Sequence, residues 1–258
     1  MEPHPAATRL EMTKECTAIE KSASLAHSRL DMWLGIIKEL KLVTVAEVGV
    51  YRGEFAESLL HYASGIEKYY MIDSWRHLDD WNKPWNKADA EFVEIKDEAL
   101  RRTDFAAARR IVLEGKTTEV ADRIPPESLE FAYIDGDHTL RGITVDLIRM
   151  WPKMKSPAIL GGDDFGRYAW GHGRQFEPTL VFPLAVHFAE AVGAVIYGLP
   201  FKQFAIVVER SSSKFEFRDL TNAYRSTGLL HALRGRGGVG EISRKIVRKI
   251  KELRSGAT

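Results

Sequence analysis

Residues 42–53 read LVTVAEVGVYRG. The run from Leu42 to Val50 is apolar and rich in β-branched side chains, which is typical of a buried strand in a doubly wound sheet. Gly49 and Gly53 stand four positions apart, so the backbone can turn tightly there and approach a ligand closely. A helix predicted over residues 53–64 would present its free N–H groups to that ligand. This stretch predicts the first strand, turn and helix of an α/β fold.

Strand and helix patterns alternate along the rest of the chain, which indicates a mostly parallel sheet with helices on both faces. Two consecutive strands near the end predict one antiparallel strand. We therefore expect a Rossmann-like, doubly wound α/β sheet of seven strands, six of them parallel. The later strands are predicted over residues 68–75, 109–115, 129–138, 158–165, 193–200 and 203–209, and helices over residues 88–102, 117–124, 140–154 and 180–192.

Three regions are expected along the chain. Apolar residues recur at helical spacing over residues 17–40, so residues 1–40 are interpreted as an N-terminal helical extension. Residues 41–210 form the main domain. Residues 211–258 form a C-terminal extension, in which residues 234–254 hold eight Lys or Arg and two Glu beside a narrow stripe of isoleucines. We interpret this stretch as a basic helix that packs on the domain or on a partner subunit; contact with an anionic membrane surface is the less favoured alternative.

Composition excludes several classes of protein. The net charge is +1, so overall electrostatics indicates no nucleic-acid partner. The lone cysteine, Cys16, rules out an intrachain disulfide and a multi-cysteine metal site. No apolar run approaches the roughly 18 residues that span a membrane, and the N-terminus does not resemble a secretory signal. We expect a cytoplasmic protein.

Carboxylates end the first two predicted strands. Glu47 lies just inside the first strand, where it could accept a hydrogen bond from an ammonium group, which S-adenosylmethionine has and NAD lacks. Asp73 ends the second strand and suits binding of a ribose diol, which occurs in many nucleoside sites. Trp75 could lie against an adenine ring, or it could be a plain core residue.

More carboxylates follow two other strands. Asp135 ends one strand, and Asp163 and Asp164 end another. If these strands are neighbours, the three carboxylates converge and repel one another unless a cation or proton intervenes. Oxygen ligands suit Mg²⁺ or Mn²⁺. The alternative is that each acidic residue caps a helix or faces solvent in a turn.

His138 lies three residues after Asp135, where it could serve as a general base. It could instead do no more than hold a loop by hydrogen bonds. His172, in a glycine-rich loop, is the weaker candidate for the base.

Together these motifs resemble the class I S-adenosylmethionine-dependent methyltransferases, in particular the bacterial family called methyltransferase domain 24. That family includes relatives of metal-dependent sugar and macrolide O-methyltransferases. The resemblance spans about Val43 to Glu209 and depends on EVGVYRG, YMIDSW, LEFAYIDGDH and GGDDF.

The resemblance assigns roles to the candidate residues. Glu47, Gly49 and Gly53 would hold the methionine part of the cofactor, and Asp73 the ribose. Asp135, close to the cofactor, would bind the metal together with Asp163 and Asp164. His138 stands where catechol-type relatives have a lysine base, so the role carries over and the residue type differs. The adenine would be flanked by Glu114, Gly115, Lys116 and Thr117.

The implied activity is transfer of a methyl group to an oxygen. A metal-bound hydroxyl would lose its proton to His138 and attack the sulfonium methyl group. A vicinal diol chelates a metal well, so we expect a sugar as acceptor before a catechol, and a homo-oligomer is compatible with the sequence. Residues Arg76 to Asp104, with Trp81 and Trp85, are expected to cover the acceptor pocket. One alternative is a metal-free methyltransferase that uses His138 alone as the base and whose acceptor atom could also be nitrogen. Another is a non-catalytic cofactor-binding subunit. An NAD-dependent oxidoreductase is disfavoured because the G-x-G-x-x-G motif is missing.

Overall fold

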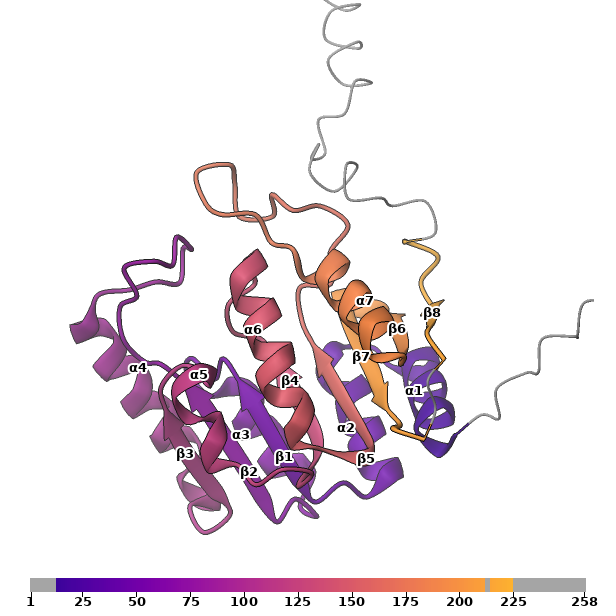
Figure 1. Ribbon diagram of the computed structural model, residues 1–258. Helices are drawn as coiled ribbons and strands as arrows, with labels where there is room; N and C mark the ends of the chain where they lie inside the picture. The colour runs from indigo at the N-terminus through magenta and orange to yellow at the C-terminus, as the bar shows by residue number, and fades with distance from the viewer. Residues whose placement is uncertain (1–12, 212–213, 225–258) are drawn as a thin grey trace, which may run out of the picture.

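The computed structural model describes residues 13–211 and 214–224. Helices and strands alternate along the chain, as the hydrophobic pattern predicts (Figure 1). The helices are α1 (Lys14–Leu25), α2 (Arg29–Leu40), α3 (Glu54–Tyr62), α4 (Asp89–Arg102), α5 (Thr117–Val120), α6 (Leu140–Met150) and α7 (Val181–Val192). The strands are β1 (Thr44–Val48), β2 (Lys68–Asp73), β3 (Arg110–Glu114), β4 (Leu129–Ile134), β5 (Met154–Gly162), β6 (Val195–Leu199), β7 (Gln203–Val208) and β8 (Glu216–Asp219).

The strands form one sheet in the order β3-β2-β1-β4-β5-β7-β6-β8. Strands β1 to β5 are parallel, and β7 runs antiparallel to both of its neighbours, β5 and β6. This confirms the predicted doubly wound, mostly parallel sheet with one antiparallel strand. The sheet has one strand more than the seven expected, because β8 pairs in parallel with β6 at the edge. The sequence analysis assigned that segment to the C-terminal extension.

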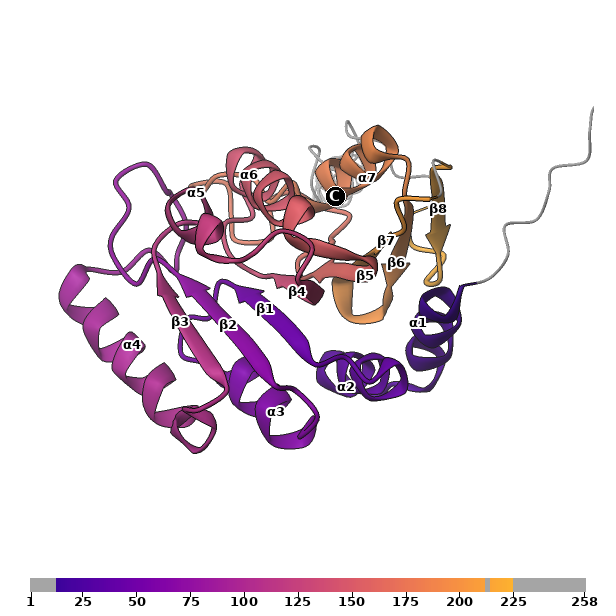
Figure 2. The same cartoon turned by 60° about the horizontal axis from the view of Figure 1, so that its bottom comes forward.

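Helices cover both faces of the sheet. Figure 2 shows α5, α6 and α7 on one face and α2, α3 and α4 on the other. Successive strand residues point to opposite faces, so Val45 joins the core beneath α2 and α3 while Ala46 and Val48 join the core beneath α6 and α7. Both faces of β1 are therefore buried, which explains why its residues other than Thr44 and Glu47 are apolar.

The N-terminal helical stretch is two helices instead of the single run suggested by its periodicity. Ser28 begins the second helix, because its side chain accepts a hydrogen bond from the backbone N–H of Asp31. Trp33 of α2 is fully buried against Gly161 of β5, where an added Cβ would lie 2.3 Å from the indole ring. The small residue in β5 thus lets α2 pack directly on the sheet.

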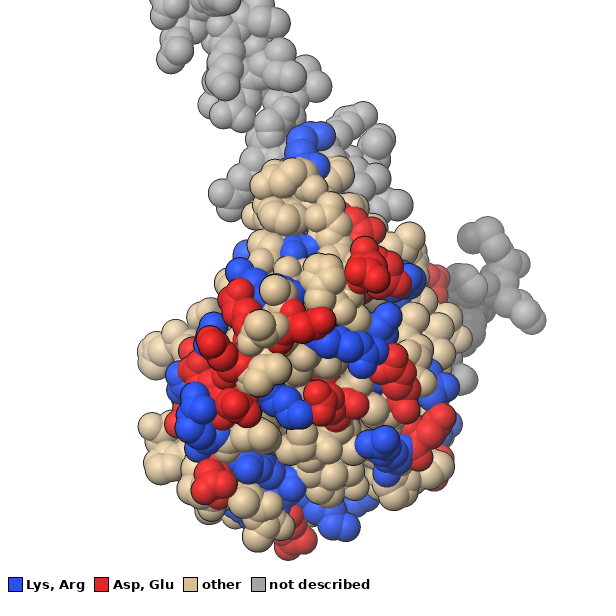
Figure 3. All heavy atoms as spheres, turned by 90° about the vertical axis from the view of Figure 1, so that its left-hand side faces the viewer, with Lys and Arg blue, Asp and Glu red and all other residues tan. Residues whose placement is uncertain are grey.

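Three further observations concern the expectations about partners and location. No helix among the described residues has the length and apolar character to cross a membrane. The predicted basic helix at residues 234–254 lies outside the described residues. Figure 3 shows one face of the molecule, on which acidic and basic side chains are interspersed.

Candidate active site

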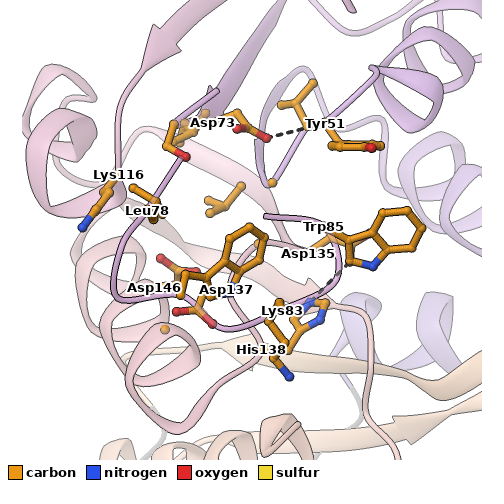
Figure 4. Close-up of a pocket in the computed structure, with 18 of the residues that line it drawn as sticks. Tyr51, Asp73, Leu78, Lys83, Trp85, Lys116, Asp135, Asp137, His138 and Asp146 are labelled. Atoms are coloured by element: carbon orange, nitrogen blue, oxygen red, sulfur yellow. Dashed lines mark hydrogen bonds and ion pairs between the residues drawn. The ribbon is translucent and has the colours of Figure 1, made fainter. Parts of the chain in front are cut away.

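A cavity of about 1110 Å³ lies at the carboxyl ends of the parallel strands. The turns after β1, β2, β4 and β5 contribute to its wall, as the rule for doubly wound sheets predicts. Figure 4 shows Tyr51, Asp73 and Asp135, from the ends of β1, β2 and β4 or the turns after them, gathered around the cavity, with Trp85 and Lys83 of the β2–α4 loop beside them. The topology therefore brings together side chains that are far apart in the sequence.

Glu47 lies at the inner wall of the cavity. Its side chain is buried and accepts a hydrogen bond of 2.6 Å from the Tyr69 hydroxyl. Burial raises the pKa of Glu47 to about 8, and the nearby carboxylates of Asp135 and Asp73 act in the same direction. A buried carboxylate of this kind gains by binding a cation, because the cation compensates for the lost hydration.

The two glycines that follow β1 have different roles. Gly49 lines the cavity with φ +90°, and an added Cβ would lie 2.3 Å from the backbone carbonyl oxygen of Asp135. The absence of a side chain there lets the turns after β1 and β4 approach each other closely. Gly53 does not line the cavity; its missing side chain makes room for Ala99 of α4. The small size of Gly53 thus serves the packing of α4, and its expected contact with the cofactor remains a prediction.

Asp73 enters the cavity and Trp75 does not. Asp73 accepts hydrogen bonds of 2.8 Å from the backbone N–H groups of Tyr51 and Trp75, and Figure 4 shows the first of them. Burial raises the pKa of Asp73 against the effect of these hydrogen bonds. Trp75 is 4% exposed in the core, and its indole N–H donates to the carbonyl of Tyr51. The core interpretation of Trp75 therefore applies, and its proposed contact with an adenine ring is not supported.

Only some of the residues predicted around the end of β3 line the cavity. Gly115 and Thr117 line the cavity together with Lys116. Glu114 is on the surface, where it pairs with Lys96 of α4, so the expected role beside the adenine is not supported for this residue. Thr117 donates a hydrogen bond of 2.6 Å to Asp146, a buried carboxylate of α6. Burial raises the pKa of Asp146 to about 7.

The three predicted metal ligands do converge on one end of the cavity. They alternate there with two cationic side chains. Arg29 Nη1 contacts Asp163 Oδ2 and lies 3.6 Å from Asp135 Oδ2. His138 lies with Nε2 3.4 Å from Asp135 Oδ1 and with Nδ1 2.8 Å from Asp164 Oδ2. Groups of the protein itself thus offset two of the three negative charges.

The donor set does not fit the expected Mg²⁺ or Mn²⁺. No group of three or more His, Cys, Asp or Glu in the described ranges is arranged to hold a metal ion. The reason is that the carboxylate oxygens are directed toward Arg29 and His138 instead of toward a common point. The sequence argument that converging carboxylates require a cation is correct, but the cations are side chains, one of them from α2.

His138 and Asp164 form a tightly coupled pair. Burial alone would lower the pKa of His138, but hydrogen bonding and attraction from Asp135 and Asp164 outweigh it and raise the pKa to about 10. Burial would raise the pKa of Asp164, but His138 lowers it to about 2. In the free protein, His138 is therefore an imidazolium ion between two carboxylates near neutral pH.

Two loops meet over the cavity. Lys83 of the β2–α4 loop is buried and donates to the carbonyl of Glu177 at 2.8 Å and to the hydroxyl of Thr179 at 3.1 Å. Asn82 exchanges hydrogen bonds with the same β5–α7 loop, at Gln175 and Glu177. Residues 74–88 form the β2–α4 loop, and residues 89–102 of the segment expected to cover the acceptor pocket form helix α4, as the sequence predicts. Trp81, Trp85 and His172 line the cavity from these loops.

Sequence reasoning missed several of these residues. Arg29 and Lys83 carry no motif, and their partners lie far along the chain. Gln203 follows a run of loop residues, yet it is fully buried and donates to Asp163 at 2.7 Å. Among these residues, only Asp146 could have been recognised from the sequence, since it stands on the apolar face of α6 with Ile143 and Leu147.

Comparisons with known proteins agree with this architecture. Residues 46–165 match the family model of a methyltransferase domain. This part of the chain is therefore similar to a methyltransferase domain. The matched range holds the turns after β1, β2, β3, β4 and β5, so it includes most of the cavity wall. A search of curated proteins finds no match.

Solved structures show the same fold at low sequence identity. A Staphylococcus aureus protein described as a proposed caffeoyl-CoA O-methyltransferase is 12% identical, with TM-score 0.52, over 71% of this chain and 85% of its own. The O-methyltransferase NovP is 11% identical, with TM-score 0.50, over 76% and 81%. The cofactor-bound Rv0187 from MTB is 13% identical, with TM-score 0.50, over 81% and 99%. This chain therefore shares its fold with these proteins.

Proposed function

We propose that this methyltransferase transfers the methyl group of S-adenosylmethionine to a hydroxyl of a small polyhydroxylated acceptor, such as a sugar. The observation that carries the proposal is the division of the cavity into two chemically different ends. Glu47 and Asp73 stand at one end, and the His138–Asp164 pair stands at the other. The first end suits an amino-acid nucleoside, and the second suits a group that loses a proton.

The cofactor end provides one partner for each part of S-adenosylmethionine. Glu47 accepts from the ammonium group, which offsets the cost of a buried carboxylate. Gly49 allows the methionine to lie against the backbone. Asp73 keeps free lone pairs for the ribose hydroxyls, because each of its oxygens accepts from one backbone N–H group. Gly115 and Thr117 flank the adenine.

The acceptor end favours a substrate rich in hydroxyl groups. Two buried ring nitrogens that line the cavity lack a hydrogen-bond partner among the described residues: Nε1 of Trp81 and Nδ1 of His172. Buried polar atoms without partners are uncommon and costly, so a ligand that supplies oxygens is expected to satisfy them. A sugar supplies several such oxygens, whereas a flat catechol supplies two.

The reaction needs no covalent enzyme intermediate. The acceptor hydroxyl gives its proton to His138, whose orientation is fixed by the hydrogen bond from Nδ1 to Asp164. The sulfonium ion adds a positive charge to the cavity, which lowers the pKa of His138 toward the range of a base. The oxygen then forms a bond to the methyl carbon as the bond from carbon to sulfur breaks, and S-adenosylhomocysteine leaves.

The test is a methyl-transfer assay with labelled S-adenosylmethionine and a panel of sugars, catechols and amines. We expect label in a sugar ether, identified by mass spectrometry and NMR. His138→Gln should lower the rate by about 100-fold or more and change cofactor affinity little. His187→Gln, on the exposed surface of α7, is the control and should behave as the wild type. Label on an amine, or cofactor binding without turnover on any acceptor, would contradict the proposal.

A further inference from the structure

We propose that Arg29 of the N-terminal helix α2 is the resident cation of the acceptor site and takes the role that the sequence suggests for a divalent metal. The inference deepens the function proposed above and rests on it. Under this proposal the helix α2 is part of the catalytic apparatus, and turnover does not require a divalent ion.

The arrangement of charges carries the proposal. Along the acceptor end of the cavity the order is Asp163, Arg29, Asp135, His138 and Asp164, so each cation lies between two carboxylates. Arg29 Nη1 contacts one oxygen of Asp163 and is 3.6 Å from one oxygen of Asp135. A divalent ion bound by the same oxygens would have to displace this guanidinium, or lie beside it against its repulsion.

A second set of contacts holds Asp163 in its orientation. Its Oδ1 accepts from Gln203 Nε2 at 2.7 Å and from the backbone N–H of Asp164 at 2.6 Å. Gln203 is fixed in turn, because its Oε1 accepts from Trp33 Nε1 at 2.9 Å and from the Tyr133 hydroxyl at 2.8 Å. A buried hydrogen-bond network therefore holds the Asp163 carboxylate in an orientation toward Arg29. The position of Asp163 thus suits Arg29 as its cationic partner.

Arg29 has N–H groups that remain available to donate hydrogen bonds to a substrate. A guanidinium has five N–H donors, and the hydrogen bonding of Arg29 within the described part of the chain uses Nη1. The side chain lines the cavity at 44% exposure, and its guanidinium carbon lies 5.9 Å from the centre of the Phe55 ring. The remaining N–H groups can donate to the acceptor oxygen and stabilise the negative charge that develops when its proton leaves.

The first experiment titrates the full-length protein with MnCl₂ by calorimetry and needs no substrate. We expect no binding by the wild type at millimolar concentrations. Arg29→Met removes the positive charge beside Asp163 and Asp135 and should bind Mn²⁺ at least about tenfold more tightly than the wild type. Arg29→Lys keeps the charge and should bind none. Arg149→Met, which breaks an ion pair with Asp122 outside the cavity, is the control and should behave as the wild type.

The second experiment measures turnover with and without EDTA. Wild-type activity should be unchanged by EDTA. Arg29→Met should lose about 100-fold in kcat while its affinity for S-adenosylmethionine stays near that of the wild type, and Arg29→Lys should recover part of the rate.

Two results would overturn the proposal. One is stoichiometric Mn²⁺ binding by the wild type, and the other is an Arg29→Met protein that neither gains Mn²⁺ affinity nor loses activity. The titration needs neither acceptor nor cofactor. If the proposed reaction is not observed, the metal-binding result therefore still tests whether Arg29 occupies the cation site.

Discussion

At the scale of single residues, the cavity contains groups whose burial or backbone conformation is energetically unfavourable. Glu47 is a buried carboxylate whose pKa is raised to about 8, and Gly49 adopts a backbone conformation that L side chains rarely take. Such features persist where the surrounding structure fixes them, and they are common at binding sites. Each of them leads to a separate prediction.

Substitution of Glu47 should weaken binding of S-adenosylmethionine. Glu47→Gln keeps the shape of the side chain and removes the charge that pairs with the ammonium group, so we expect an affinity about 10- to 100-fold lower by calorimetry. Wild-type affinity should also rise between pH 6 and 8, because below its pKa of about 8 Glu47 must lose a proton to pair. Glu39→Gln, at an exposed ion pair with Lys21, is the control and should bind as the wild type. Equal affinities of the Glu47→Gln variant and the wild type would remove Glu47 from the cofactor site.

Gly49 should tolerate no side chain. Gly49→Ala combines a strained φ of +90° with a contact of 2.3 Å to the carbonyl oxygen of Asp135, so we expect a loss of about 2–4 kcal/mol in the free energy of unfolding. Gly65→Ala is the matched control, since an added Cβ there meets no atom within 4 Å. Urea unfolding followed by circular dichroism measures both variants. Similar midpoints for the two variants would show that the turns after β1 and β4 can separate at little cost.

At the scale of elements, the acceptor end of the cavity depends on two loops that hold each other. Lys83 joins the β2–α4 loop to Glu177 and Thr179 of the β5–α7 loop, although almost a hundred positions separate them. A buried lysine is costly unless its donors are used, so these contacts both fix the loops and satisfy the ammonium group. The expectation that the segment covers the acceptor pocket and becomes ordered on binding remains a prediction.

Lys83→Met should loosen these loops without unfolding the domain. The variant keeps most of the apolar length of the side chain and loses the hydrogen bonds, so limited proteolysis should cut within residues 74–88 several times faster than in the wild type. Cofactor together with acceptor should protect the wild type from this cleavage. Lys87→Met, in the same loop, serves as the control. Cleavage rates that are the same in all proteins and unaffected by ligand would contradict the lid interpretation.

At the scale of the whole molecule, buried carboxylates link stability to pH. The pKa of Glu47 is raised to about 8 and that of Asp146 to about 7, both by burial. The folded protein therefore binds more protons than the unfolded chain at intermediate pH, so its stability decreases as pH rises through this range. This direction is opposite to that of a carboxylate in an ion pair.

Calorimetric unfolding at a series of pH values checks this linkage. The free energy of unfolding should fall by about 2 kcal/mol between pH 6 and 8 from Glu47 alone. The double variant Glu47→Gln and Asp146→Asn should reduce the slope, since neither site can then lose a proton, and the decrease that remains should come from His138, whose pKa is raised to about 10. Glu39→Gln should keep the wild-type slope. A wild-type stability that rises over this range would mean that both carboxylates are ionised in the folded state.

The sequence by itself determined the order of strands and helices, the single antiparallel strand and the edge of the sheet where the cavity lies. These features follow from local patterns, such as the apolar run of Val45 to Val48 and the glycine that follows it. The sequence also identified Glu47, Asp73, Asp135 and His138, because a carboxylate or histidine directly after a buried strand stands at that edge.

Only the tertiary structure decided what these residues contact. Arg29 and Asp163 are 134 positions apart, and no periodicity or spacing links them. Their pairing depends on how α2 packs, through Trp33 against Gly161, and it replaces the expected metal ion by a guanidinium. Trp75, Gly53 and Glu114 likewise stand at or beyond the ends of strands. They contribute instead to the core, to helix packing and to the surface, because the environment of a residue there depends on which elements pack around it. Local sequence fixes where a strand ends, whereas the partner of each charged group depends on which distant elements fold against it.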